Sequence, residues 1–220
     1  MANVAWSYSR LKSFEDCPKK FYHLNIARDV KEQPSEAMTA GANDHKHLES
    51  RIREGKPLPS HLASMEPVCA AFGAARERGM ELLTEQQWAF TRDFQPTDWF
   101  SKSVWVRVIL DVAAVSKKNA LVADWKTGRR DPDWEQLKLF AAALFLQYPV
   151  EKVTAQFIWT KNGEVDSEVF HRDDAPAIWE HFIERAARLQ HAADTNTWPA
   201  QPNRWCGRCA VKLAGLCKGE

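Results

Sequence analysis

The residues of this 220-residue sequence best suited to chemistry lie where an apolar segment ends in charges. Residues 120–125 end in Asp124 and Trp125, and Lys126 follows directly. Alternate side chains of a β-strand share a face, so Asp124 and Lys126 point one way and Trp125 the other. Burying such charges costs free energy unless they have partners or a task. For this segment alone, a simple Lys–Asp pair at a solvated strand end is an equally good interpretation.

A second carboxylate favours the chemical interpretation. Residues 104–111 form another apolar segment that ends in Asp111, and a short hairpin over 113–119 would set Asp111 beside Asp124. Two carboxylates on neighbouring strands suit a hard divalent cation such as Mg²⁺. Lys126 would then stand beside a metal-bound water. There it could orient or deprotonate the nucleophile, or stabilise charge on phosphate oxygens.

A histidine and a glutamate four residues apart add to this set. On a helix His45 and Glu49 share one face, and Gly41, one turn earlier, removes a side chain that would block the approach of a strand or substrate. An isolated His/Glu pair is usually a surface interaction. His47 is the rival candidate, which we interpret as a solvated or DNA-facing histidine.

Four of the five cysteines suggest a separate metal site. Cys206, Cys209 and Cys217 are close enough in sequence to converge on one metal or cluster, and Cys17 lies near the other end. Four thiolates suit either a [4Fe–4S] cluster or a structural Zn²⁺, and spacing does not decide between them. A disulfide framework is weaker, and so is a set of free tail thiols, which would be reactive. Cys69 fits a buried small hydrophobe.

The elements that must position these residues form a mixed α/β pattern. Apolar periodicity, capping residues and turn signals predict an order of helices, strands, a crossover helix, more strands and a closing helix. We expect an N-terminal helix carrying the first cysteine within 1–35, a core over 36–194 and a cysteine-rich end over 195–220. The expected helices cover 7–25, 36–53, 66–83, 131–148 and 174–193, and the expected strands cover 87–94, 104–115, 121–125, 153–160 and 164–170.

Two details of that pattern are specific enough to test. Ser7 is the expected N-cap of the first helix, and Asp131 followed by Pro132 is the expected start of the crossover helix. The strands over 87–125 should be consecutive and antiparallel. Among the ten tryptophans, Trp6, Trp99, Trp198 and Trp205 could stack on bases, although most tryptophans are better assigned to the core.

Composition limits the class of protein. There are 30 basic and 29 acidic residues, a net charge of +1 and 45% hydrophobic residues, which excludes a disordered polyelectrolyte. Mean hydropathy is −0.48, and no apolar run approaches membrane-spanning length. With no export signal at the amino terminus, we expect a cytoplasmic protein without membrane contact. Both cysteine-bearing ends are basic, so together they would form a positive patch suited to phosphate.

The ordered set of motifs resembles the RecB-like branch of the PD-(D/E)XK nucleases, which includes AddB-type nucleases and CRISPR-associated iron–sulfur exonucleases; phage exonucleases are also similar. The resemblance spans about residues 7–217 and implies a restriction-endonuclease-like core, with a central mixed β-sheet flanked by helices and a small C-terminal cysteine-rich element. It rests on the opening S-Y-S-R-L with C-P-K-K-F, then G-x-x-x-H-x-x-L-E, a strand ending in Asp, D-x-K, and Q-L-x-x-F.

The resemblance also implies roles. His45, Asp111 and Asp124 would bind Mg²⁺ or Mn²⁺ together with the backbone carbonyl of Trp125, and Lys126 would be the catalytic lysine. Two further residues belong to the implied catalytic set: Gln136, which would support the site or contact DNA, and Glu49, the acidic position of the first motif. Cys17, Cys206, Cys209 and Cys217 would hold a [4Fe–4S] cluster. Two departures are a missing glycine before Asp111 and Phe140 where the family often has tyrosine.

These implications predict a metal-dependent DNA exonuclease that hydrolyses phosphodiesters with a metal-activated water. Its substrates would be single-stranded DNA or duplex ends, read without strong sequence preference because phosphates carry no sequence information. Recombination, repair, phage DNA processing and CRISPR adaptation all fit, as does a protein partner in a recombination or CRISPR complex. The alternatives are a structure-specific endonuclease of the same fold and an inactive DNA-binding or assembly subunit.

Overall fold

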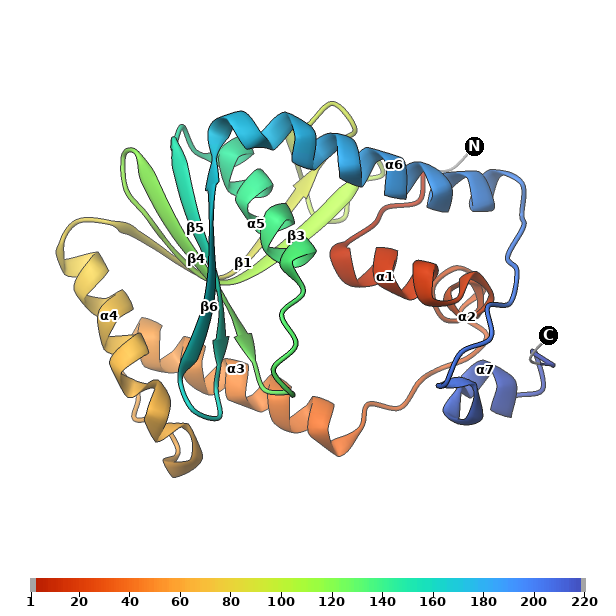
Figure 1. The fold of residues 1–220 in the computed structure, drawn as a ribbon, viewed down its shortest axis with the longest axis horizontal. Helices are drawn as coiled ribbons and strands as arrows, with labels where there is room; N and C mark the ends of the chain where they lie inside the picture. The colour runs from red at the N-terminus through yellow and green to blue at the C-terminus, as the bar shows by residue number, and fades with distance from the viewer. Residues whose placement is uncertain (1–2, 219–220) are drawn as a thin grey trace.

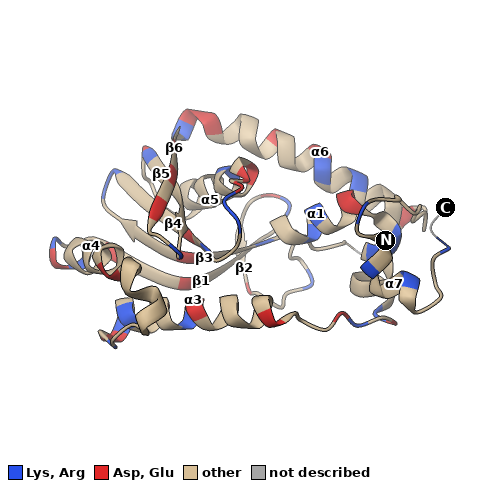
Figure 2. Ribbon diagram, turned by 60° about the horizontal axis from the view of Figure 1, so that its bottom comes forward, with Lys and Arg blue, Asp and Glu red and all other residues tan. Residues whose placement is uncertain are grey.

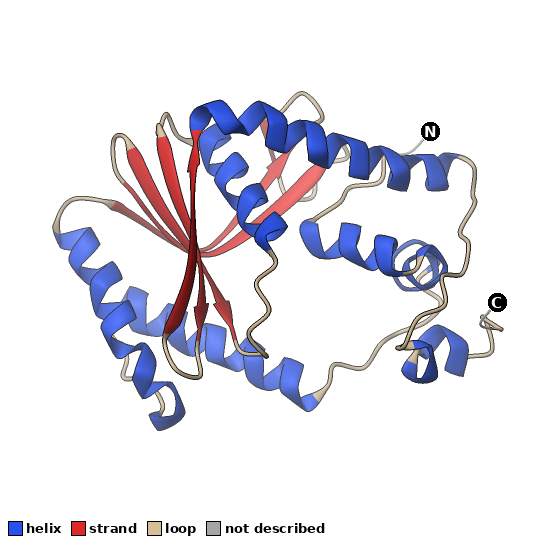
Figure 3. Ribbon diagram, viewed as in Figure 1, coloured by secondary structure: helices blue, strands red, loops and turns tan. Residues whose placement is uncertain are grey.

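A six-stranded sheet with helices on both faces forms the centre of the molecule (Figures 1 and 3). The computed structural model describes residues 3–218. The strand order is β2-β1-β3-β4-β5-β6, antiparallel throughout except for the parallel pair β4–β5. This is the mixed α/β fold with a central mixed sheet that the sequence predicts. The strands are β1 (Glu81–Phe90), β2 (Pro96–Thr97), β3 (Val106–Val115), β4 (Asn119–Lys126), β5 (Lys152–Trp159) and β6 (Glu164–His171).

The helices divide between the two faces of the sheet. One face packs against α3 (Glu36–Glu54) and α4 (Glu66–Glu77), around Leu48, Phe72 and Trp125. The other face packs against α5 (Trp134–Gln147), α6 (Ala175–Asp194) and α1 (Tyr8–Asp16). Since alternate residues of β4 face opposite ways, Trp125 belongs to the first core, whereas Asp124 and Lys126 lie on the α5 side. Among residues 3–218 no helix is both long and apolar enough to span a bilayer.

The two chain ends lie together beside the sheet (Figure 1). They comprise α1, α2 (Pro18–Phe21) and a π-helical turn (Tyr22–Ala27) at one end, and the 3₁₀ turn Cys206–Arg208 with α7 (Ala210–Leu213) at the other. The backbone N–H of Lys19 donates to the carbonyl of Pro199 at 3.1 Å, so the ends are joined directly. Trp6 is only 1% exposed and bridges to Val106 of β3, which makes it a core residue rather than a base-stacking one.

Several predicted boundaries are confirmed. Ser7 caps α1, with its hydroxyl accepting from the backbone N–H of Arg10 at 3.4 Å. Helix α3 covers the predicted range and ends at Gly55, whose φ of +74° suits a glycine at a helix C-terminus. The strands β3 to β6 and the helix α6 lie within two residues of their predicted bounds.

Four predicted elements have wrong bounds. The helix expected over 7–25 is interrupted at Cys17, whose extended backbone (φ −167°) separates α1 from α2. The helix expected over 66–83 ends at Glu77, and strand β1 begins at Glu81 rather than at residue 87. Asp131 does not cap α5. The cap residue is Asp133, and its side chain makes no capping bond because it pairs with Lys12 of α1 at 2.5 Å.

The misplaced start of β1 has a structural cause. Strands β1 and β3 pair in one continuous register, but the register skips the opposed positions Glu85 and Asp111. On β1, Trp88 packs in the α5 core and Leu82 in the α4 core, although both are even-numbered. The alternation of faces therefore reverses at Glu85, where φ is +46°. A strand predicted from alternation stops at such a reversal.

Candidate active site

Three carboxylates stand in a row across three neighbouring strands. The register of β1 and β3 sets Glu85 opposite Asp111, and the pair Val112–Ala123 sets Asp124 at the next position across from Asp111. Asp111 and Asp124 are 9% and 6% exposed, and Glu85 is half-buried. Asp111 Oδ2 accepts from the backbone N–H of Trp125 at 2.8 Å, in place of a ladder bond. Like charges opposed across strands repel, so this row needs positive charge nearby.

Helix α3 supplies an imidazole to this row. The Nδ1 atom of His45 lies 3.4 Å from Asp111 Oδ1, and its Nε2 lies 3.2 Å from the carbonyl oxygen of Trp125. Gly41, one turn earlier, lets the helix come this close. A Cβ at Gly41 would lie 2.8 Å from Oγ1 of Thr127, closer than real Cβ contacts. The glycine predicted to permit close approach therefore faces the residue directly after Lys126.

A lysine and a glutamine hold Asp124 from the other side. Lys126 Nζ forms an ion pair with Asp124 Oδ2 at 2.6 Å and donates to Gln136 Oε1 at 2.8 Å. Gln136, on α5, donates its Nε2 to Asp124 Oδ1 at 2.9 Å. The ammonium of Lys126 also lies over the ring of Phe157, 4.6 Å from its centroid. Asp124, Lys126 and Gln136 thus form a closed triangle whose members fix one another.

Asp124 and Glu85 bind protons more readily than ordinary carboxylates do. Burial, followed by the charge of Asp111, raises the pKa of Asp124 to about 7, although Lys126 and His45 act in the opposite direction. Burial and Asp111 also raise the pKa of Glu85. Burial alone would lower the pKa of His45, but the hydrogen bond and charge of Asp111, with the charges of Asp124 and Glu85, raise it. The negative charge here exceeds what the neighbouring cations neutralise, as expected where a divalent cation binds.

The donor set fits a divalent metal. One ligand atom each from His45, Glu85 and Asp111 lies within 4.8 Å of the others. Two carboxylates and an imidazole are donors that Mn²⁺ accepts readily, and Mg²⁺ accepts the carboxylates. The carbonyl of Trp125 is at the same place, because His45 contacts it. Asp124 lies beside this group with its oxygens directed to Lys126 and Gln136.

Sequence reasoning missed Glu85. The structure brings together His45, Asp111, Asp124, Trp125, Lys126 and Gln136, all named from sequence. Glu49 lies one turn along α3 from His45, pairs with Arg53 at 2.7 Å, and is near enough for its charge to affect Glu85. His47 is exposed. Glu85 lies between the helix expected over 66–83 and the strand expected over 87–94, so no predicted element placed it.

The model of the PD-(D/E)XK nuclease superfamily matches residues 5–214, which is nearly the whole chain. The chain belongs to this superfamily. Such nucleases hydrolyse phosphodiesters and use divalent metals, in agreement with the acidic row and its lysine. DNA is accordingly the substrate class that the family implies.

Solved structures add information on the fold. The crystal structure of SSO0001 matches with 14% identity and a TM-score of 0.52, over 98% of this chain and 86% of that one. An alkaline exonuclease (LHK-Exo) from Laribacter hongkongensis matches with 8% identity and a TM-score of 0.31, over 89% and 95%. A TM-score of 0.31 is too low for the second structure to support any statement about this chain. No curated protein matches this chain.

In this PD-(D/E)XK protein the four sequence-predicted cysteines meet at one place. Cys17, Cys206, Cys209 and Cys217 line a single small pocket, although Cys17 is 189 positions from Cys206. Two of the sulfurs accept backbone N–H groups, from Gln201 to Cys17 at 3.4 Å and from Asn203 to Cys206 at 3.2 Å. Cys69 is buried in the α4 core, as predicted.

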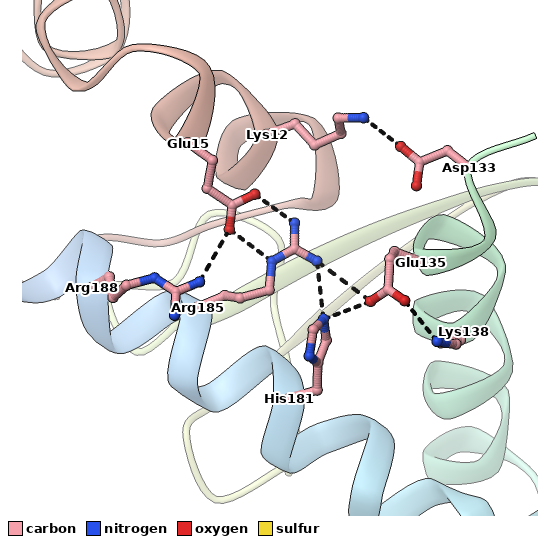
Figure 4. Close-up of polar contacts among 8 residues, drawn as sticks. All are labelled: Lys12, Glu15, Asp133, Glu135, Lys138, His181, Arg185 and Arg188. Carbon is pink, nitrogen blue, oxygen red and sulfur yellow. Dashed lines mark hydrogen bonds and ion pairs between the residues drawn. The ribbon is translucent and has the colours of Figure 1, made fainter. Parts of the chain in front are cut away.

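A polar network fixes the N-terminal helix of this nuclease to its core (Figure 4). Arg185 of α6, only 7% exposed, binds both oxygens of Glu15 of α1 at 2.8 and 2.7 Å. Glu135 of α5 contacts His181 at 2.6 Å and Lys138 at 2.6 Å. With the Lys12–Asp133 pair, these contacts join α1 to the helix that carries Gln136. A continuous set of polar contacts therefore runs from α1, which precedes Cys17, to the helix beside the candidate active site.

Proposed function

We propose that this protein is a metal-dependent DNA exonuclease of the RecB-like branch, with the site described above as its catalytic centre. One observation carries the proposal: three acids aligned across β1, β3 and β4 meet His45 on one side and the Lys126–Gln136 pair on the other. Such a site has cationic and hydrogen-bonding groups placed before substrate arrives, which is how electrostatic catalysis is achieved.

The proposed metal ligands are His45, Asp111, Asp124 and the carbonyl of Trp125, with Glu85 as an addition from the structure. A bound Mg²⁺ or Mn²⁺ supplies Lewis acidity toward the phosphate and lowers the pKa of a bound water. Glu85 and Asp111 face each other across two strands, so their positions follow from the sheet and not from a flexible loop. Glu49 would act from one turn further along α3, through its charge on Glu85.

Lys126 is the proposed catalytic lysine. Its ammonium is held by Asp124, Gln136 and the Phe157 ring, so little conformational entropy remains to be lost when substrate binds. From this position it can orient or deprotonate the attacking water and stabilise the charge that builds on phosphate oxygens. Gln136 keeps both Asp124 and Lys126 in orientation, which is a positioning role.

For the four cysteines we propose a [4Fe–4S] cluster rather than zinc. Four thiolates suit either group, and the resemblance to iron–sulfur members of the family favours the cluster. The N–H donors to Cys17 and Cys206 would suit its charged sulfurs. It would join the end segments 1–35 and 195–220 beside the core of 36–194.

An exonuclease is favoured by the surroundings of Lys126. Lys126 and Gln136 line a cavity of about 1310 Å³ whose other walls come from α1, from the loop around Phe100 and from the cysteine-bearing segment around Trp205. A DNA strand that must enter a cavity enclosed by several segments of the chain can thread in by a free end, whereas a closed circle has no end to insert. Recombination, repair, phage DNA processing or CRISPR adaptation would each provide such ends, and a protein partner there would present them.

The test uses end-labelled linear and closed-circular DNA with anaerobically purified protein, in Mg²⁺, Mn²⁺ or chelator. Lys126→Ala is compared with Lys118→Ala, the same change just before the opposite end of strand β4, where the lysine side chain is 72% exposed. We expect metal-dependent shortening of linear DNA by the wild type and Lys118→Ala, and none by Lys126→Ala. Cutting of circles would instead support an endonuclease, and binding without cleavage under all conditions an inactive subunit.

The cofactor is tested on the same samples. A brown solution with visible absorption and about four irons per chain is expected for the cluster. A colourless protein with one zinc per chain would overturn that part of the proposal and leave the nuclease assignment intact.

A further inference from the structure

Three arginines from separate segments of the chain line one cavity, and none of them has an acidic partner among the described residues. Arg10 of α1, Arg28 after the π-helical turn and Arg107 of β3 all line the 1310 Å³ cavity that contains Lys126, and all three also line a second cavity of about 660 Å³. Among residues 3–218 none of the three forms an ion pair, although many other lysines and arginines there do.

Arg10 is the most constrained of the three. Its guanidinium lies over the ring of Phe21 at 5.4 Å, and its Nε is buried with no hydrogen-bond partner in the part of the chain that the structure describes. Burial, then the charges of Arg107 and Arg28, lower the pKa of Arg10, so the three cations repel one another in the molecule as it stands. A buried donor without a partner and uncompensated like charges both cost stability, and an anion would relieve both.

Aromatic side chains accompany these arginines. Arg107 donates its Nε to the carbonyl of Trp99 at 3.0 Å and lies over the Trp99 ring. Phe100, next in the chain, is 90% exposed, and Trp205, which lines the same cavity, is 53% exposed and has the guanidinium groups of Arg204 and Arg208 over its ring. Alternating cations and exposed aromatic rings are the surface that single-stranded nucleic acid binds, through its phosphates and its bases respectively. Figure 2 shows further Lys and Arg on α1, on α7 and in the loop between β4 and α5.

We propose that Arg10, Arg28 and Arg107 form a phosphate-binding subsite that holds the DNA strand away from the catalytic row, in the same cavity as Lys126. The proposal rests on the nuclease function proposed above and adds where the strand is held. Guanidinium groups bind phosphate with two parallel hydrogen bonds, and among the described residues no acceptor competes for the Nε of Arg10. The phosphate is either an internal phosphodiester or the terminal phosphate of a strand end, and the two are separable by experiment.

The test measures binding, so that it is independent of cleavage. A 3′-fluorescein-labelled 12-nucleotide strand, with a 5′-phosphate or a 5′-hydroxyl, is titrated with the full-length, anaerobically purified protein in chelator, at several salt concentrations. Arg10→Gln and Arg107→Gln are each compared with Arg76→Gln, an exposed arginine on α4 at the other face of the sheet. We expect roughly tenfold weaker binding for each subsite variant, and a weaker dependence of affinity on salt because one cation fewer neutralises the phosphates.

The outcomes separate the two sources of phosphate. Equal weakening with both strands indicates an internal phosphodiester, and weakening confined to the 5′-phosphorylated strand indicates a terminal phosphate. Arg10→Gln should leave the melting temperature unchanged or raised, because it removes repulsion, whereas a structural arginine would lower it. Wild-type affinity and salt dependence in both subsite variants would overturn the proposal. Because no cleavage is needed, this result stands apart from any failure of the nuclease assay.

Discussion

The catalytic row and the cysteine-bearing ends are held in place by different means. Asp111 and Asp124 lie on β3 and β4, and the residues next to them on these strands, Val112 and Ala123, are fully buried. Between residues 200 and 218, by contrast, Val211 is the one fully buried residue. The sheet therefore fixes the candidate catalytic site without any ligand, whereas the cysteine end has a much smaller core, and under the proposed ligation its position would depend on the group that its thiolates hold.

The largest effect is expected where charge is removed from the catalytic row. Asp111→Asn should lower the rate of DNA cleavage by about a thousandfold, since metal coordination is worth several kcal/mol in the transition state. The melting temperature should not fall, because the change also removes repulsion with Glu85 and Asp124. Steady-state cleavage and thermal melting are measured beside Asp93→Asn, a matched change in an exposed turn. Loss of folding together with activity would contradict a ligand-independent site.

At the cysteine-bearing ends, loss of a proposed ligand should change local stability rather than leave it unchanged. Cys17→Ser should abolish visible absorption and raise the rate of proteolysis within 3–30 and 195–218 by about tenfold or more, because the segments lose their common ligand. The core over 36–194 should keep its melting transition. Cys69→Ala, which removes a thiol outside this group, should keep its colour. Equal protection of the ends in both variants would show that packing, and not ligation, holds them.

A third effect concerns the join between these two regions. Glu15→Ala leaves the buried Arg185 with only longer contacts, 3.5 Å to His181 and 3.7 Å to Glu135. Removing one partner of a buried pair is costly, so we expect a loss of about 2 kcal/mol in the free energy of unfolding by denaturant. Glu36→Ala, at an exposed position of α3, is the control. A loss no greater than that of Glu36→Ala would mean that apolar contacts alone hold α1.

The sequence predicted the residues on the sheet far better than the contacts that join α1 to α5. Asp111, Asp124 and Lys126 were identifiable because strand alternation and hairpin length are local properties that fix which residues become neighbours. Glu85 was not, because its φ of +46° and the reversal of faces there arise from packing between β1 and β3. The interruption at Cys17 and the start of α5 after Asp133 likewise depend on contacts more than a hundred residues apart, such as Lys12 with Asp133. Apolar periodicity is a local pattern and does not predict such long-range contacts.

A smaller, pH-dependent effect tests the electrostatics of the row. The pKa of Asp124 is about 7, above its value in the unfolded chain. The folded state therefore binds more protons between about pH 4 and 7, and this group's contribution to stability falls as pH rises through that window. In chelator at pH 8, Asp124→Asn should be more stable than wild type by about 1–2 kcal/mol, after allowing for the partner that Lys126 loses.

The measurement is denaturant unfolding at pH 8 and at pH 6, where the difference between Asp124→Asn and wild type should shrink. Asp93→Asn, which lies outside the row, should show no such dependence. If Asp124→Asn were less stable at pH 8 and its deficit did not change with pH, the ion pair with Lys126 would outweigh the burial of the carboxylate.

The smallest effect tests how closely α3 must approach the sheet. Alanine is favoured over glycine within a helix by about 1 kcal/mol, but at Gly41 its Cβ would meet Thr127 Oγ1 at 2.8 Å. Gly41→Ala alone should therefore bring no gain in stability. In a Thr127→Ala background the obstruction is gone, and the same change should stabilise by about 0.5–1 kcal/mol. Equal effects in both backgrounds would show that Thr127 yields without cost, and that the glycine is not what sets the distance between His45 and the catalytic strands.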